Sequence, residues 1–140
     1  MARTVIEFPE NILFSTAYTV LMSDVNRADH LGADRIFSIV IESQMRFFTH
    51  LGYDRTIEGV SYIVADTEFI FKAESKYLDE LTIDVAASNI REKSCELIYR
   101  IQNSSKGTLA ALVKTGVVFV DNETASPTAM PSVFKASIGG

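Results

Sequence analysis

The chain has 140 residues, of which 47% are hydrophobic and 22% are charged. This length and composition predict one folded domain with its own core and exclude a disordered chain. The 13 basic and 18 acidic residues give a net charge of −5, which argues against nucleic acid or a membrane surface as a partner. A single cysteine excludes a disulfide scaffold.

No metal site is expected, because the two histidines and Cys95 do not fall into a ligand spacing. The first residues, MARTVIEFPE, lack the apolar run of a signal peptide, and the apolar stretch 109–120 is interrupted by Lys114 and too short to span a bilayer. We therefore expect a cytoplasmic protein.

The first half of the chain predicts an irregular lead-in over 1–11, a strand over 14–23 and a helix over 32–51. Gly52 is placed to end this helix in a left-handed conformation. The helix is predicted from apolar residues at helical spacing. These are Ile36, Val40, Phe47 and Leu51, with Phe37, Ile41 and Phe48 widening the stripe.

Alternation of apolar and polar residues predicts four further strands, over 63–72, 81–88, 95–102 and 108–121. Short turn segments join the strands, which favours antiparallel neighbours. The order indicates an α+β domain in which a curved antiparallel sheet wraps around one long helix. Residues 122–140 contain two of the three prolines and are expected to form a loose tail, so that 1–140 is a single domain.

Three segments in order resemble the hotdog-fold acyl-CoA thioesterases. Residues 18–32, YTVLMSDVNRADHLG, are similar to the pattern SDxDxxGHVNN that precedes the helix in the 4-hydroxybenzoyl-CoA thioesterase group. FIFKA at 69–73, followed by DELT at 79–82, is similar to the YxxPA and GDELxV of that group. VVFVD at 117–121, with Pro131 beyond it, fits the group's last strand and tail.

This resemblance covers about residues 12–134 and implies the hotdog fold. It also implies hydrolysis of an acyl-CoA or acyl-carrier-protein thioester, with coenzyme A as part of the substrate and no separate cofactor. Subunits of the family pair edge to edge with the active sites at the interface, so a homodimer or a homotetramer is expected.

The chain departs from the family pattern where the catalytic carboxylate normally lies. Asn26 stands at that position, Asp29 replaces the glycine before the histidine, and Gly32 with Ala33 replaces the Asn pair after it. An amide can orient water or donate to a carbonyl, but it cannot act as a base or a nucleophile. A second interpretation is that Asn26 is a turn residue bonded to its own backbone.

The resemblance places oxyanion binding at the start of the helix, near Gly32, Ala33 or Asp34, where unpaired N–H groups and the helix dipole favour negative charge. Gly32 could instead serve only the turn into the helix. His30 occupies the position of the family's pre-helix histidine and could accept a proton near neutral pH. Alternatively, it packs under the helix and fixes the loop.

Two carboxylates are further catalytic candidates. Asp24 lies two residues before Asn26 and projects to the same side of an extended chain, although it could instead cap the end of the strand. Glu42 is considered because a second branch of hotdog thioesterases takes its carboxylate from the helix. Its i, i+4 spacing to Arg46 also fits a solvated ion pair.

The leading functional hypothesis is thioester hydrolysis, and two alternatives stay open. An enoyl-thioester hydratase of the same fold has a motif similar to DxNPxH, and Asp24, Asn26 and His30 approach it without the proline and with the histidine one residue late. A hotdog domain that binds acyl thioesters without turnover is favoured by the missing acid at position 26.

Overall fold

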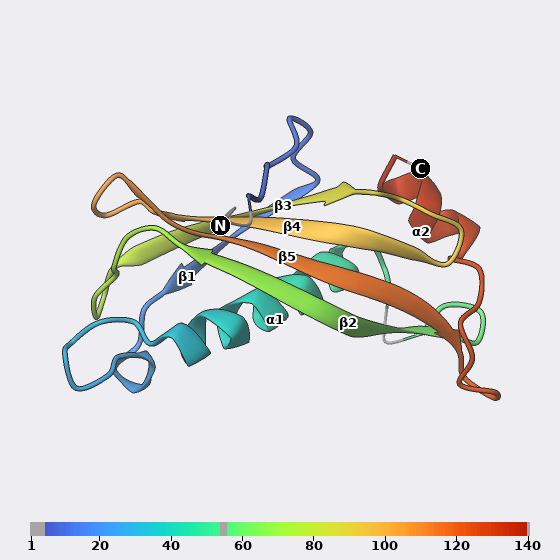
Figure 1. The fold of residues 1–140 in the computed structure, drawn as a ribbon, viewed down its shortest axis with the longest axis horizontal. Helices are drawn as coiled ribbons and strands as arrows, with labels where there is room; N and C mark the ends of the chain where they lie inside the picture. Colours follow the sequence, from blue (N-terminus) through green and yellow to red (C-terminus); the bar gives the residue numbers. More distant parts are fainter. Residues whose placement is uncertain (1–4, 54–55, 140) are drawn as a thin grey trace.

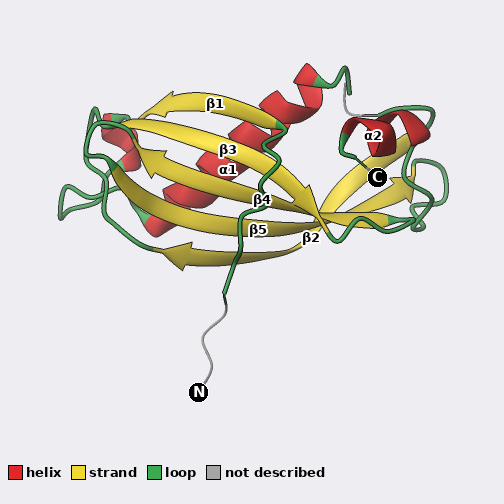
Figure 2. Cartoon of the chain, turned by 90° about the horizontal axis from the view of Figure 1, so that it is seen from above, coloured by secondary structure: helices red, strands yellow, loops and turns green. Residues whose placement is uncertain are grey.

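The computed structural model of the chain describes residues 5–53 and 56–139. Its strands form one antiparallel sheet in the order β1-β3-β4-β5-β2, and the sheet curves around α1 (Figures 1 and 2). The predicted α+β architecture is therefore confirmed. Within the described ranges, no helix has the length and apolarity needed to cross a membrane. The elements are β1 (Phe14–Thr19), the 3₁₀ turn η1 (Met22–Asp24), α1 (Ala33–His50), β2 (Val60–Phe71), β3 (Glu80–Ser88), β4 (Ser94–Asn103), β5 (Thr108–Asp121) and α2 (Ser132–Ser137).

Helix α1 buries an apolar stripe against the concave face of the sheet. Ile36, Val40 and Phe47 are buried in this layer, as the periodicity predicts. Gly52 has φ +81° and ends the helix in the predicted left-handed conformation. The N–H of the next residue, Tyr53, then donates to the carbonyl of Phe48 at 2.8 Å and fixes the exit of the chain.

Polar side chains replace part of the predicted stripe. Gln44 is buried because its Oε1 accepts a hydrogen bond from the Tyr99 hydroxyl in the core at 3.0 Å. Ser43 is buried because its hydroxyl donates to the carbonyl of Ile39 one turn earlier, at 2.8 Å. Phe37, by contrast, is 40% exposed and forms a T-shaped ring pair with Phe69, so the periodicity places this residue wrongly.

Strand β2 contains a bulge that changes which side chains face α1. Its register against β5 shifts between Val64 and Asp66. Before the bulge, Tyr62 stacks on Phe48 with ring centroids 4.1 Å apart, whereas Ile63 is exposed. After it, Phe69 packs against the core. Strict alternation starting at Ile63 is therefore wrong for the first part of the strand, because one inserted residue exchanges the two faces.

Strand β1 is shorter than predicted and ends at Thr19 instead of continuing to residue 23. The N–H of Leu21 donates to the carboxylate of Asp24 at 2.8 Å, which turns the chain into η1. This early turn brings residues 24–32 back under the first turn of α1.

Residues 5–13 are irregular, as predicted, and cross the face of the sheet that lies away from α1 (Figure 2). Ile6 is buried on this outer face. The ring of Phe8 lies 4.2 Å from the guanidinium carbon of Arg100, which also binds the carboxylate of Asp84 at 2.8 Å. The lead-in thus covers part of the outer face.

The expected loose tail over 122–140 is instead packed against the domain through its described residues. Phe134 of α2 stacks on Phe48 with ring centroids 5.2 Å apart, and lies 5.1 Å from the ring of Phe119. Met130 and Ile138 are buried on the same side. The spacing of these three apolar residues, four apart, is a helical signal that the prolines and glycines obscure.

Replacing Phe134 with alanine is expected to lower the free energy of unfolding by about 3 kcal/mol, because it opens a cavity in the aromatic cluster. Val133→Ala is the matched control, since Val133 lies on the same helix with its side chain exposed. Urea denaturation of both variants measures the effect. Equal stability of the two variants would contradict the packing of α2.

Candidate active site

The loop before α1 closes a tight turn between Asn26 and His30. The N–H of Asn26 donates to the carbonyl of His30 at 2.9 Å. The Asn26 Oδ1 accepts the N–H groups of Ala28 at 3.0 Å and His30 at 3.3 Å. Asp29 adopts a positive φ of 62° within this turn. The side-chain carbonyl of Asn26 therefore holds the loop, and the structure brings Asn26 and His30 together.

Asp24 is buried beneath this turn and is surrounded by donors. Its carboxylate accepts hydrogen bonds from the Tyr18 hydroxyl at 2.7 Å, the Leu21 N–H at 2.8 Å and the Arg35 Nε at 3.1 Å. Burial alone would raise the pKa of Asp24, but these three donors outweigh it and lower the pKa below its ordinary value. Burial and the bond to Asp24 raise the pKa of Tyr18 to about 12. The geometry makes Asp24 an anchor of the loop.

The first turn of α1 leaves two backbone donors without a partner. The N–H of Gly32 donates to the carbonyl of Asp24 at 3.0 Å, and the N–H of Arg35 donates to the carbonyl of Gly32 at 3.0 Å. Ala33 and Asp34 have no acceptor for their N–H groups among the residues that the structure describes. Of the three residues predicted to bind an oxyanion, Ala33 and Asp34 are thus available and Gly32 is occupied.

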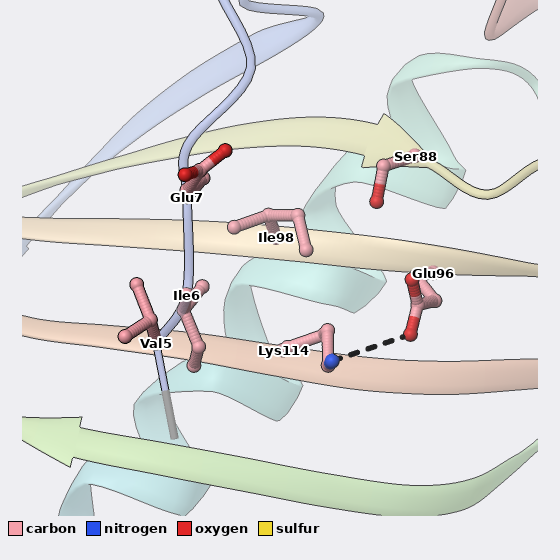
Figure 3. Close-up of a pocket in the computed structure, with 7 residues that line it drawn as sticks. All are labelled: Val5, Ile6, Glu7, Ser88, Glu96, Ile98 and Lys114. Carbon is pink, nitrogen blue, oxygen red and sulfur yellow. Dashed lines mark ion pairs between the residues drawn. The ribbon is translucent and has the colours of Figure 1, made fainter. Parts of the chain in front are cut away.

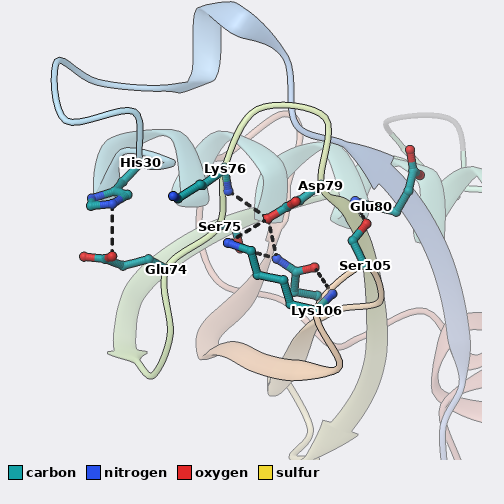
Figure 4. Close-up of polar contacts among 9 residues, drawn as sticks. His30, Glu74, Ser75, Lys76, Asp79, Glu80, Ser105 and Lys106 are labelled. Carbon is teal, nitrogen blue, oxygen red and sulfur yellow. Dashed lines mark hydrogen bonds and ion pairs between the residues drawn. The ribbon is translucent and has the colours of Figure 1, made fainter.

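A second loop, between β2 and β3, lies against the first. The N–H of Leu31 donates to the carbonyl of Ser75 at 2.8 Å. Asn103, which is fully buried at the end of β4, donates from its Nδ2 to the Ser75 Oγ at 3.2 Å and to the Asp79 Oδ2 at 2.8 Å. Lys106 pairs with the same carboxylate at 3.3 Å (Figure 4). Burial would raise the pKa of Asp79, but these donors together with the Lys76 N–H lower it.

This arrangement places Glu74 beside His30. The Oε2 of Glu74 lies 3.1 Å from the Nε2 of His30, as the dashed line in Figure 4 marks. The histidine side chain is 30% exposed and that of the glutamate 69% exposed. Sequence reasoning missed Glu74, because the contact depends on the bond between Leu31 and Ser75 and has no signal along the chain.

A cavity of about 220 Å³ opens next to the start of α1. One wall is apolar, and the rim carries the charged side chains of Lys72 and Glu74. Such an apolar slot with a few polar groups suits a ligand that has an acyl part and a polar reacting centre. The lining residues are Leu31, Ala33, Ile36, Phe71, Lys72, Ala73 and Glu74.

Glu42 is separated from this group. It pairs with Arg46 at 2.8 Å, and Arg46 also donates to Thr16 Oγ1 at 2.9 Å and to the carbonyl of Ala17 at 2.8 Å. These contacts tie α1 to β1. Glu42 also lies about 13 Å along the helix from Ala33, since each residue adds about 1.5 Å.

Another cavity, of about 250 Å³, lies on the outer face of the sheet under the lead-in segment (Figure 3). Ile6 and Ile98 form part of its wall, and Lys114 bridges Glu68 and Glu96 at 3.4 Å each. The sheet separates this cavity from α1, so it receives neither the helix N-terminus nor the turn that holds His30.

Asp24→Asn is expected to lower the free energy of unfolding at neutral pH by about 2 kcal/mol, because Arg35 and the other donors lose a charged acceptor. The pKa of Asp24 is lower in the folded than in the unfolded chain. The contribution of the Asp24 carboxylate to the free energy of unfolding is therefore complete above its pKa in the unfolded chain, near 3.8. This contribution is lost as pH falls through its pKa in the folded chain. The difference from the parent should shrink toward about pH 2 in urea denaturation.

Asp29→Asn is the control for this experiment, because Asp29 is exposed in the same loop and asparagine tolerates its positive φ. A constant difference between Asp24→Asn and the parent across the acidic range would contradict the role assigned to the carboxylate.

Solved structures share this arrangement of sheet and helix. The 1,4-dihydroxy-2-naphthoyl-CoA thioesterase from Synechocystis superposes with a TM-score of 0.81 at 13% identity, covering 89% of this chain and 94% of that one. The SAV2348 protein from Staphylococcus aureus, in complex with CoA, superposes with a TM-score of 0.83 at 16% identity, covering 96% of this chain and 85% of that one. A gentisyl-coenzyme A thioesterase superposes with a TM-score of 0.78 at 17% identity, covering 90% of this chain and 100% of that one. The expected hotdog fold is thereby confirmed.

No curated protein sequence matches the chain. The sequence profile of the thioesterase-like superfamily, however, matches residues 20–138, which include every element of the sheet except β1 as well as both α-helices. The chain belongs to the thioesterase-like superfamily.

Proposed function

We propose that this protein hydrolyses acyl-CoA thioesters to a free acid and a thiol, in the cavity beside the start of α1. The observation that carries the proposal is the position of Ala33. It lines the cavity, and its N–H and that of Asp34 have no acceptor among the described residues. Membership of the thioesterase-like superfamily supports the same reaction, as do CoA thioesterases among the structures with this fold.

The proposed reaction uses these donors to stabilise charge on the thioester oxygen. N–H groups at a helix start point out along the axis, where they stabilise a developing oxyanion. The acyl group lies along the apolar wall formed by Leu31, Ile36 and Phe71. Water attacks the carbonyl carbon, and the group that accepts its proton belongs to the pair of His30 and Glu74 at the rim. Coenzyme A enters as part of the substrate.

The proposal includes a homodimer or a tetramer built on such dimers. Strand β2 is an edge of the sheet and runs for 12 residues, which leaves a long row of unpaired backbone groups. Phe37 and Phe71 expose large apolar surfaces beside this edge. Because Phe71 also lines the cavity, a second subunit at β2 would cover the open side of the site.

A panel of acyl-CoA esters of different chain length and aromatic content tests the activity. Release of free thiol is expected with at least one ester. Loss of the enoyl absorbance from an enoyl-CoA without thiol release would instead support the hydratase. Saturable binding of acyl-CoA without either change would identify a non-catalytic binding domain, and both of these outcomes would overturn the proposal.

The oligomeric state is expected to be at least a dimer at micromolar concentration, as measured by light scattering. Phe37→Glu should shift the protein toward the monomer and lower its turnover, because it places a charge beside the β2 edge. Val133→Glu is the control, since Val133 is an exposed apolar residue on α2. A parent protein that stays monomeric, or a Phe37→Glu variant that stays dimeric, would contradict pairing at this edge.

A further inference from the structure

We propose that the Glu74 carboxylate is the general base of this site and that His30 is its positioning residue. The inference rests on the proposed thioesterase function and assigns the base within it. Position 26 carries no carboxylate because it is an asparagine, and Asp24 is buried among its donors. Asp29, the exposed acid of the same turn, is not among the residues that line the cavity. Glu74, in the loop after β2, supplies a carboxylate beside His30 at the same cavity.

The lining of the cavity is the first observation. Glu74 and Ala33 both line this cavity, so a ligand that reaches the unpaired N–H groups of the helix start also lies next to Glu74. His30 does not line the cavity, although its Nε2 lies 3.1 Å from the Oε2 of Glu74. Of the two partners, it is therefore Glu74 that meets a bound ligand.

The way in which Glu74 is held is the second observation. The backbone bond between Leu31 and Ser75 joins the residues that follow His30 and Glu74, and so brings the two side chains within reach of each other. Ser75 is itself held by a hydrogen bond from the buried Asn103. The Nε2–H of His30 then occupies one carboxylate oxygen and leaves the other to accept a hydrogen bond from water.

The step balances with water as the only co-reactant. The free oxygen of Glu74 takes a proton from water while the water oxygen forms a bond to the thioester carbon. The Ala33 and Asp34 N–H groups stabilise the negative oxygen of the tetrahedral intermediate. When the intermediate collapses, the carbon–sulfur bond breaks, and the proton passes from the Glu74 carboxyl group to the departing thiolate. The products are the carboxylic acid and the thiol.

The test measures kcat and KM on whichever acyl-CoA the parent protein hydrolyses best. Glu74→Gln should lower kcat by about 100-fold or more with little change in KM, because the amide keeps the shape but cannot accept the proton. Glu92→Gln is the matched control, since this exposed glutamate lies between β3 and β4, away from the cavity. It should leave both constants near those of the parent.

His30→Ala and a rescue variant separate the two roles. His30→Ala should lower kcat less than Glu74→Gln does, because it only releases the carboxylate. Adding Asn26→Asp to Glu74→Gln should restore part of the lost kcat, since an aspartate can keep the turn through the same oxygen and offers a second base beside the helix. Unfolding in urea checks that each variant stays folded.

Three outcomes would overturn the assignment while leaving the thioesterase function in place. They are near-parental kcat in Glu74→Gln, a larger loss in His30→Ala than in Glu74→Gln, and a rise in KM that accounts for the whole effect. A parent protein that releases no thiol from any ester instead overturns the proposed function itself. The two failures are therefore distinguishable.

Discussion

The buried carboxylate of Asp24 is the contact on which the rest of the site depends. It is 1% exposed and gathers a hydroxyl from β1, a backbone N–H from the turn and a guanidinium from α1. Its own carbonyl accepts the N–H of Gly32 at the helix start. One residue thus fixes the end of a strand, the loop and the first turn of the helix. A charged group held so firmly by donors stabilises the fold but is poorly suited to proton transfer.

The proton transfer that we propose is instead assigned to side chains that are held less tightly. His30 and Glu74 come from two loops whose backbones are joined by one bond between Leu31 and Ser75. Asn103, which is fully buried, holds the second loop through its hydrogen bond to Ser75, the residue next to Glu74. The supporting residues Asp24 and Asn103 are buried and hydrogen-bonded, whereas the side chains of His30 and Glu74 reach solvent. Such a distribution is common in sites that must admit a substrate.

Periodicity predicted α1, the strands and their antiparallel order because each of these is a local pattern. It failed at the bulge in β2, since one inserted residue reverses the faces without leaving a break in the apolar sequence. The candidate site could be predicted only where its residues are contiguous, as Asn26 and His30 are. Glu74 could not, because a backbone hydrogen bond between distant segments brings it to His30, and no composition or spacing encodes that bond.

The stacking of Phe134 on Phe48 has a consequence for synthesis on the ribosome. Helix α1 emerges early, yet its residue Phe48 is covered by Phe134 of α2, which is translated much later and packs in turn on Phe119 of β5. The nascent chain therefore carries an uncovered apolar helix through most of translation, with few local contacts to protect it. Slow elongation over the second half of the message would prolong that exposure, and the yield of folded protein should depend on elongation speed and on chaperones that shield such helices.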